Sequence, residues 1–471
     1  MKNTPGTPAA SARETDQPSA GRPETSSPTA AGTESASVHA KALAINLDPS
    51  VYGSFAEIGA GQEIARWFLR VGGAAGTVAQ TISAYDKTYS DATYGAGTRY
   101  VSRERLTAML AHEFDQLEER LGSTRGAECR FFALADTVSA RNYKGDNEQH
   151  GWIGIRFQTE PRGAASDILL HVNLMDATAQ AQQAALGLLG VNLVHCAFHR
   201  RGSPDEFLAG LFDELGIERL ELDVIALAGP AFAKADARAW SLRALGRGIA
   251  HAIVFDAAGE VVEPSSVLRK RPLIVQRGRF ATFEPFQAEM LRASARQLAA
   301  EGQPSAGDPS TVLELSLHAL GDEQPPAEAE VLARVQRLRE LGVVIVSDFP
   351  QSYLLVRYLQ RHTREPVRMV VGVSALLQLL HASYYDTLPG SLLEGLGRFL
   401  ATNVKVHAYP MPLDAFRRAS ARIAGEVLED FPKGPLVTAG DLRPKPPLGH
   451  LYDYLCSAGW IVPVTQVKGR G

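Results

Sequence analysis

The stretch Val343-Val-Ile-Val-Ser-Asp348 decides the fold class of the second half of the chain. Four consecutive β-branched apolar residues are typical of a strand that is buried on both faces, and the strand is expected to end before Asp348. Helical patterns lie on both sides of it, over 327–341 and 351–362. A buried strand between two helices favours a parallel sheet layered with helices.

The same alternation of strand and helix extends to both sides of this stretch. Further strands are expected at 312–317, 367–371 and 404–408, and further helices at 374–382 and 392–401. The segment 301–310 is rich in Gly, Pro, Ser and Asp, as linkers are. We therefore predict an α/β domain over residues 306–471.

The first two thirds of the chain have a different pattern. Residues 126–305 are predicted to form a mixed α+β domain, with strands at 129–138, 152–158, 168–174 and 220–227 and helices at 178–199, 205–215 and 234–248. Residues 45–125 are predicted to be mainly helical, because 56–69 and 103–121 carry apolar residues at helical spacing. The predicted fold class is α/β with a mixed α+β middle region, a helical N-terminal region and a largely parallel C-terminal sheet.

Residues 1–44 are expected to be a disordered tail. The first 37 residues contain no Val, Ile, Leu, Phe, Tyr or Trp, so they cannot bury enough apolar surface to offset the entropy lost on ordering. They show no apolar core of a secretory signal, and a cytoplasmic location is expected. The tail is either a tether for a partner or a dispensable extension.

Composition excludes several classes of function. The 471 residues carry a net charge of −4, so no basic surface for nucleic acid is expected. Three cysteines are too few for a disulfide framework and fit a reducing compartment. No run reaches the ~18 apolar residues of a membrane span, because the best one, 184–198, is interrupted by Asn192 and His195.

Several catalytic motifs are incomplete. No G-x-x-x-x-G-K-[ST] phosphate-binding loop occurs. The stretch His112-Glu-Phe-Asp-Gln116 begins like a zinc-protease helix, but Gln116 stands where the second histidine ligand belongs. No metal site is predicted, and the sequence points to no particular cofactor.

The stretch Phe55-Ala-Glu-Ile-Gly-Ala-Gly-Gln-Glu63 supplies the first candidate ligand-binding residues, Glu57, Gly59 and Gly61. Backbone amides exposed beside glycines can hold a phosphate or a carboxylate. The alternative is that the glycines only allow close packing of neighbouring elements.

The polar loop from Arg141 to His150 supplies the second group of candidates. Arg141 and Lys144 are candidate ligand-binding cations, and His150 is a candidate catalytic residue because its imidazole titrates near neutral pH. The alternative is an exposed connection between two strands.

Asp348 is the candidate catalytic carboxylate of the C-terminal domain. It follows a predicted strand, as Gly372 follows the next one, and open α/β sheets bind ligands outside the carboxyl ends of their strands. We therefore expect Asp348 near a ligand site.

Four stretches together resemble those of a bacterial family: Tyr52-Gly-Ser-Phe-Ala-Glu-Ile-Gly-Ala-Gly-Gln-Glu63, Arg70-Val-Gly-Gly73, His150-Gly-Trp-Ile-Gly-Ile-Arg-Phe-Gln158 and Gly229-Pro-Ala-Phe232. Members of this family carry the transferred names nicotinate-nucleotide adenylyltransferase and TonB-dependent receptor, and the resemblance covers residues 47–410. The first name implies an [HT]-x-G-H motif near the first strand. The nearest match, Pro447-Leu-Gly-His450, begins with proline and stands near the other end of the chain, so no catalytic residue is transferred from the family.

These observations predict a cytoplasmic protein that binds a nucleotide or another phosphorylated small molecule. A group-transfer activity of the nucleotidyltransferase kind is one form that this function would take. The alternative is a non-catalytic, self-assembling scaffold whose tail recruits a partner. Self-association into a homo-oligomer is expected in either case.

Overall fold

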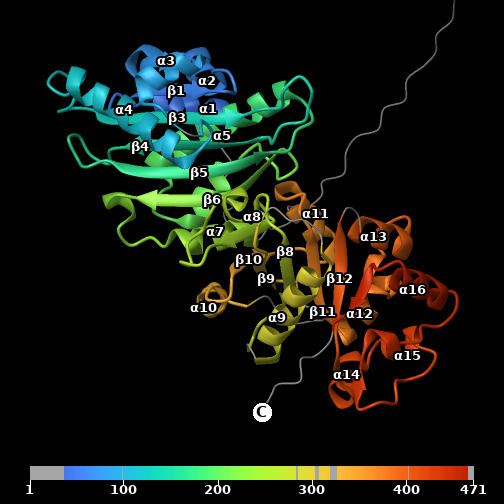
Figure 1. Ribbon diagram of the computed structural model, residues 1–471. Coiled ribbons are helices and arrows are strands. Elements are labelled where there is room, and N and C mark those ends of the chain that lie inside the picture. Colours follow the sequence, from blue (N-terminus) through green and yellow to red (C-terminus); the bar gives the residue numbers. More distant parts are fainter. Residues whose placement is uncertain are drawn as a thin grey trace, which may run out of the picture. The chain divides into compact units, whose positions relative to one another are not determined.

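The computed structural model describes residues 37–97, 99–282, 285–302, 307–318, 326–400 and 403–464 (Figure 1). Residues 1–36 of the predicted tail lie outside the described residues. From Val38 to Asn46 the chain forms helix α1, so the tail was predicted to extend too far. Ser37 caps this helix by accepting a hydrogen bond from the Ala40 amide, and Val38, Ala42 and Ile45 are buried, which explains why the segment is helical.

Six strands form the first sheet, sheet A. They are β1 (Val51–Ile58), β2 (Val78–Ile82), β3 (Arg130–Ser139), β4 (His150–Phe157), β5 (Ser166–Leu174) and β6 (Leu220–Ala228). Their order is β2-β1-β3-β4-β5-β6. The first three strands are mutually parallel, whereas β3, β4, β5 and β6 pair antiparallel.

Helices cover both faces of sheet A. They are α1, α2 (Glu63–Val71), α3 (Lys87–Tyr94), α4 (Arg103–Leu121), α5 (Ala179–His199), α6 (Pro204–Leu211) and α7 (Ala237–Gly246), with short 3-10 turns at Ala74–Gly76 and Pro230–Phe232. A Cβ on Gly154 of β4 would lie 3.1 Å from Leu106 of α4, whereas the ring of Phe157 packs 5.6 Å from that of Phe198 on α5. Because neighbouring strand residues point to opposite faces, α4 and α5 cover opposite faces of the sheet.

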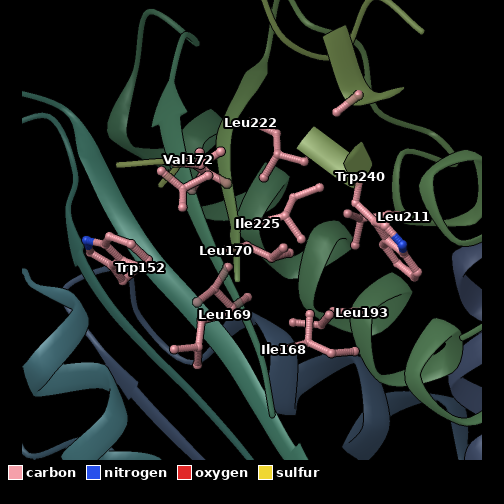
Figure 2. Close-up of a cluster of buried hydrophobic side chains, with 14 of the residues drawn as sticks. Trp152, Ile168, Leu169, Leu170, Val172, Leu193, Leu211, Leu222, Ile225 and Trp240 are labelled. Atoms are coloured by element: carbon pink, nitrogen blue, oxygen red, sulfur yellow. The ribbon is translucent and has the colours of Figure 1, made fainter. Parts of the chain in front are cut away.

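The buried side of sheet A facing α5 is shown in Figure 2. Ile168 and Leu170 of β5 and Ile225 of β6 point towards Leu193 of α5, while Trp152 and Leu169 lie on the other side of the sheet. The strands shown are therefore buried on both faces, and most of their side chains are apolar.

Seven strands form the second sheet, sheet B. They are β7 (Ala252–Phe255), β8 (Leu273–Gly278), β9 (Ser310–Ser316), β10 (Val343–Ser347), β11 (Val367–Gly372), β12 (Val404–Tyr409) and β15 (Ile461–Pro463), in the order β15-β12-β11-β8-β9-β10-β7. All pairs are parallel except that of β7 with β10. The predicted α/β fold class and the largely parallel C-terminal sheet are confirmed, whereas the N-terminal region is not mainly helical.

Helices also surround sheet B. They are α8 (Pro264–Leu268), α9 (Pro285–Ala300), α10 (Glu328–Leu338), α11 (Ser352–His362), α12 (Val373–Leu379), α13 (Ser391–Phe399), α14 (Leu413–Ser420), α15 (Ala424–Val427) and α16 (Leu448–Ser457), with 3-10 turns at Ala382–Tyr385 and Ala439–Asp441. A separate ribbon pairs β13 (Met411–Pro412) with β14 (Leu436–Val437). Strand order reverses between β8 and β11: β9 and β10 continue on one side of β8, and β11 and β12 on the other.

Two strands in residues 45–125 were not predicted. β1 and β2 lie where a mainly helical segment was expected, and the helix predicted over 56–69 begins only at Glu63. β1 is buried along seven of its eight residues, so it lacks the alternation of apolar and polar residues that marks a half-exposed strand. Strands on either side of residue 125 pair in sheet A, and strands on either side of residue 305 pair in sheet B. The predicted domain limits at these positions stay predictions.

Helix α5 has the length and composition of a membrane-spanning helix, with a mean hydropathy of 1.2 over its best window. Within the fold, 72% of that window is buried. Packing against α1, α2 and sheet A therefore accounts for its apolar side chains.

Candidate functional site

A cavity of about 710–750 Å³ lies at each of two places in the fold. The first, which we call the switch-point cavity, opens at the carboxyl ends of β8, β9 and β11 and has a volume of about 750 Å³. These strands flank the position where strand order reverses. This is where open parallel sheets bind ligands, because the connections leave the sheet in opposite directions and open a crevice between them.

Arginine supplies the charge of the switch-point cavity. Among the described residues that line it, Arg277 and Arg279 are charged at neutral pH and none is acidic. The guanidinium of Arg277 donates to Ser316 Oγ at 3.0 Å and to the carbonyl of Phe349, and its Nε lies 3.4 Å from a carboxylate oxygen of Glu314. Its Nη1 is buried and has no hydrogen-bond partner.

Glu314 stands opposite Arg277 on the neighbouring strand β9 and is fully buried. Burial raises the pKa of this carboxyl, whereas Arg277 and a hydrogen bond donated by Ser347 act in the opposite direction. Glu314 therefore holds the Arg277 side chain from the neighbouring strand β9.

The rest of the switch-point cavity is largely apolar. Its wall is formed by Phe286, Met290, Met369, Phe399 and Met411, together with Tyr384. Small residues stand at the strand ends, since Gly278 is the last residue of β8 and Gly372 the last of β11. A molecule with a flat apolar part and an anionic part matches such a lining.

The second cavity, which we call the histidine cavity, has a volume of about 710 Å³ and lies against β4, β5, α8 and α11. His150 of β4 stands opposite Asn173 of β5, and Trp152 stands opposite His171. Because residues two apart share a face, all four side chains project from the same face of sheet A. His150 Nδ1 and His171 Nε2 are 2.8 Å apart.

A bulge in the pairing of β5 with β6 places Asp223 next to His171. His171 pairs with Val224 and Val172 with Leu222, so Asp223 has no partner in the register. Its carboxylate accepts hydrogen bonds from His171 Nδ1 at 2.6 Å and from Asn173 at 2.8 Å. Bulges often aim a side chain into a site, and here the bulge completes a buried chain of contacts from Asp223 through His171 to His150.

Burial and charge move the pKa values of these imidazoles apart. Burial lowers the pKa of His171, but the adjacent Asp223 carboxylate more than offsets this, so the net shift is upward. Burial, and then the neighbouring His171, lower the pKa of His150. Burial lowers the pKa of His362, at the end of α11, to about 3.

Glu263 approaches the two histidines from the connection between β7 and α8. Its carboxylate accepts a hydrogen bond from the indole of Trp152 at 3.4 Å and lies 3.4 Å from Arg99. One donor atom from each of His150, His171 and Glu263 lies within 4.8 Å of the other two. Among the residues that the structure describes, these three side chains form a cluster that could hold a metal ion.

Glu57 lies outside both cavities, on β1. Its carboxylate accepts hydrogen bonds from the amides of Ile64 and Ala65 in the first turn of α2, at 3.0 and 2.9 Å. Asp136 stands directly across from it on β3. Burial raises the pKa of Glu57 to about 7, and burial together with the charge of Glu57 raises that of Asp136.

Gly59 and Gly61 form the turn between β1 and α2, with φ of 100° and 79°. A Cβ on Gly59 would lie 1.9 Å from the carbonyl oxygen of Val138, so Gly59 permits the turn to approach β3. A Cβ on Gly61 would meet no atom within 4 Å. Neither residue lines the histidine cavity or the switch-point cavity.

Arg141 and Lys144 are exposed in the loop between β3 and β4. Of the predicted loop residues, His150 lines the histidine cavity, whereas Arg141 and Lys144 do not. Their part in ligand binding stays a prediction.

Asp348 follows β10 at the carboxyl edge of sheet B, as predicted. Its carboxylate lies 3.2 Å from His251 Nδ1 and raises the pKa of that imidazole. The neighbouring Pro350 and Ser352 line the switch-point cavity, but Asp348 does not. The seven predicted site residues are therefore distributed over several places and do not line one cavity.

Sequence reasoning missed Arg277, Arg279, His171, Asp223 and Glu263. A signal existed for His171, because a histidine stood inside the predicted apolar strand 168–174. Arg277 and Arg279 come just after the predicted strand 273–276. The rule that ligands bind at strand ends, which marked Asp348, could have marked these two arginines as well. Asp223 carried the same signal as His171 inside the predicted strand 220–227, whereas nothing local marks Glu263, because its role comes from a contact distant in sequence.

Comparisons with known proteins show a partial structural similarity. No protein-family model matches the chain, and no curated protein matches it. The competence/damage inducible protein CihA from Agrobacterium tumefaciens is similar over 33% of this chain and 93% of its own, with 19% identity and a TM-score of 0.26. A CinA superfamily protein from Enterobacter cloacae covers 37% of this chain and 99% of its own, with 12% identity and a TM-score of 0.28.

A CinA superfamily protein from Escherichia coli covers 36% of this chain and 93% of its own, with 11% identity and a TM-score of 0.25. The similarity thus covers about a third of the chain, and no activity is transferred from it. The resemblance to a bacterial family that the sequence motifs suggest stays a prediction.

Proposed function

We propose that the protein binds a nucleotide or another phosphorylated small molecule in the switch-point cavity. The observation that carries this proposal is a large cavity at the reversal of strand order in a parallel sheet, with arginines as its charged lining. The cavity volume is in the range of about 300–1,000 Å³ that small-molecule sites occupy.

Arg277 supports binding of an anion. Three contacts anchor its guanidinium, yet Nη1 is buried without a partner. An unsatisfied buried donor costs about 1–3 kcal/mol, and more when it is charged. Arg277 also lines the cavity, and arginine is suited to phosphate because its planar fork of donors matches the oxygens.

The apolar wall supports a ligand that also has a ring. Phe286 and Tyr384 offer aromatic surface, and the methionines adapt to irregular shapes and contact aromatic rings favourably. A phosphate attached to a base or to another flat group would use both parts of the lining. Group transfer on the bound ligand is a separate prediction, which binding does not require.

Thermal-shift measurements on the full chain test the proposal. Suitable probes are ATP, ADP, AMP, NAD⁺, ribose 5-phosphate and pyrophosphate. A compound present at a hundredfold excess over its dissociation constant stabilises the folded chain by about 2.7 kcal/mol, which raises the melting temperature measurably. If none of these compounds raises the melting temperature, the proposed function is wrong.

Variants locate the binding site. Arg279→Glu should weaken binding of the best probe at least tenfold by calorimetry, since a charge-assisted hydrogen bond contributes about 1.5–3 kcal/mol. Ala375→Trp should also weaken it by filling the cavity, because Ala375 is exposed on its wall. Arg337→Glu is the matched control, since Arg337 is exposed on α10 and lies outside the cavity lining.

The double variant Arg141→Ala/Lys144→Ala separates this site from the loop that the sequence suggested. If this double variant binds the best probe with wild-type affinity while Arg279→Glu loses affinity, the result supports binding in the switch-point cavity. Loss in the loop variant and full binding by Arg279→Glu would contradict it.

A further inference from the structure

We propose that His150, His171 and Glu263 bind a divalent transition-metal ion, such as zinc, at the wall of the histidine cavity. Their donor atoms lie within 4.8 Å of one another, and the three residues come from β4, β5 and the connection that precedes α8. This site is separate from the switch-point cavity, so it does not depend on the proposed function.

The donor set suits such an ion. Zinc in proteins is bound by imidazole nitrogens and carboxylate oxygens, and two histidines with one carboxylate form a known three-ligand set. Both histidines and Glu263 are almost fully buried, with exposed fractions of 9%, 2% and 7%. Each of the three has a hydrogen-bond partner in the fold, and metal binding would exchange the contact between His150 and His171 for two metal–nitrogen bonds.

Asp223 orients His171 as the carboxylate partner of a metal-bound histidine does. Its contact with Nδ1 at 2.6 Å leaves Nε2 directed towards His150. The second carboxylate oxygen is fixed by Asn173 at 2.8 Å. Metal-ligating histidines usually donate their other ring N–H to a carboxylate, which fixes the tautomer and strengthens the ligand.

The two imidazoles need only a small rearrangement to share an ion. His150 Nδ1 and His171 Nε2 are 2.8 Å apart and share a hydrogen bond. Two nitrogens bound at about 2.0–2.1 Å in a tetrahedral arrangement are about 3.3 Å apart. Binding would therefore replace the shared proton and separate the rings by about half an ångström.

A further imidazole in the same cavity lacks a partner. His362 Nε2 is buried and has no hydrogen bond, while the opposite ring nitrogen lies 3.3 Å from Ser265 Oγ. His150, His171 and His362 all line the cavity. Three protein ligands also leave a coordination position for water or for a molecule in the cavity, as in catalytic rather than structural zinc sites.

Metal titration of the full, untagged chain tests this inference. After treatment with a chelator, the protein should bind one Zn²⁺ per chain with sub-micromolar affinity. With Co²⁺ it should show the visible absorption of a low-coordinate site. His150→Gln and His171→Gln should each weaken zinc binding at least a hundredfold, and Asp223→Asn about ten- to a hundredfold.

His199→Gln is the matched control, because His199 is an exposed histidine on α5 that lies outside the cavity. Zinc binding unchanged in His150→Gln and His171→Gln would overturn the assignment. The assignment would also be overturned if the wild-type chain showed no visible absorption with Co²⁺ and bound zinc no more tightly than the micromolar range. This measurement does not depend on the folding of any variant. Nucleotide binding is expected to persist in the chelator-treated chain, which keeps failure of this inference distinct from failure of the proposed function.

Discussion

Glu57 and Asp136 place two carboxyl groups directly across from each other on the buried parallel strands β1 and β3. The sequence suggested Glu57 as a ligand-binding residue, but its oxygens are used by the first turn of α2. Two like charges at adjacent buried positions cannot both be accommodated, so the pair retains a proton well above the usual pKa of a carboxyl group.

This arrangement predicts that stability falls as the pH rises. Glu57 keeps its proton in the folded chain up to a pKa of about 7, whereas the unfolded chain releases it near 4.5. Since unfolding then releases a proton, the free energy of unfolding should decrease by a few kcal/mol between pH 4.5 and 7. Glu57→Gln should make this decrease smaller in urea unfolding at pH 5 and pH 8.

Glu119→Gln, at an exposed position on α4, is the control and should follow the wild type. Equal pH dependence in the wild type and Glu57→Gln would contradict the account of the carboxyl pair.

At the scale of elements, the sequence predicted most of the helices and strands because their patterns are local. The helix predicted over 178–199 is α5, and the strand predicted over 343–346 is β10. β1 was missed because it is buried on both faces and contains Gly53 and Glu57, which are unusual in a strand interior. Only its pairing with β2 and β3 explains why this segment is extended.

The turn between β1 and α2 gives a test of the packing interpretation of its glycines. Gly59→Ala should lower the free energy of unfolding by about 3 kcal/mol, because the added Cβ would collide with Val138 in a backbone conformation unfavourable for alanine. Gly61→Ala should lower it by about 1 kcal/mol, because only the conformation is unfavourable. Denaturant unfolding of the two variants measures the difference.

If both variants kept wild-type stability and lost affinity for a phosphorylated probe, the glycines would be a ligand cradle, and the packing interpretation would be wrong.

At the scale of the whole molecule, the sequence could not predict how distant strands share a sheet. β7 and β8 precede the predicted limit at residue 305, yet they pair with strands that follow it. Those pairings create the reversal of strand order beside β8, and with it the switch-point cavity. The general location of a ligand site at the strand ends could be predicted, whereas the arginines that line it depend on which strands are neighbours.

Hydrogen–deuterium exchange of the full chain, with and without ATP, ADP, NAD⁺ or pyrophosphate, tests the central claim most directly. At least one of these compounds should slow exchange in residues 276–279 and 370–378, at the carboxyl ends of β8 and β11, and Arg279→Glu should abolish this protection. Unchanged exchange in both segments with every compound, or protection confined to 57–61 and 141–150, would contradict ligand binding in the switch-point cavity.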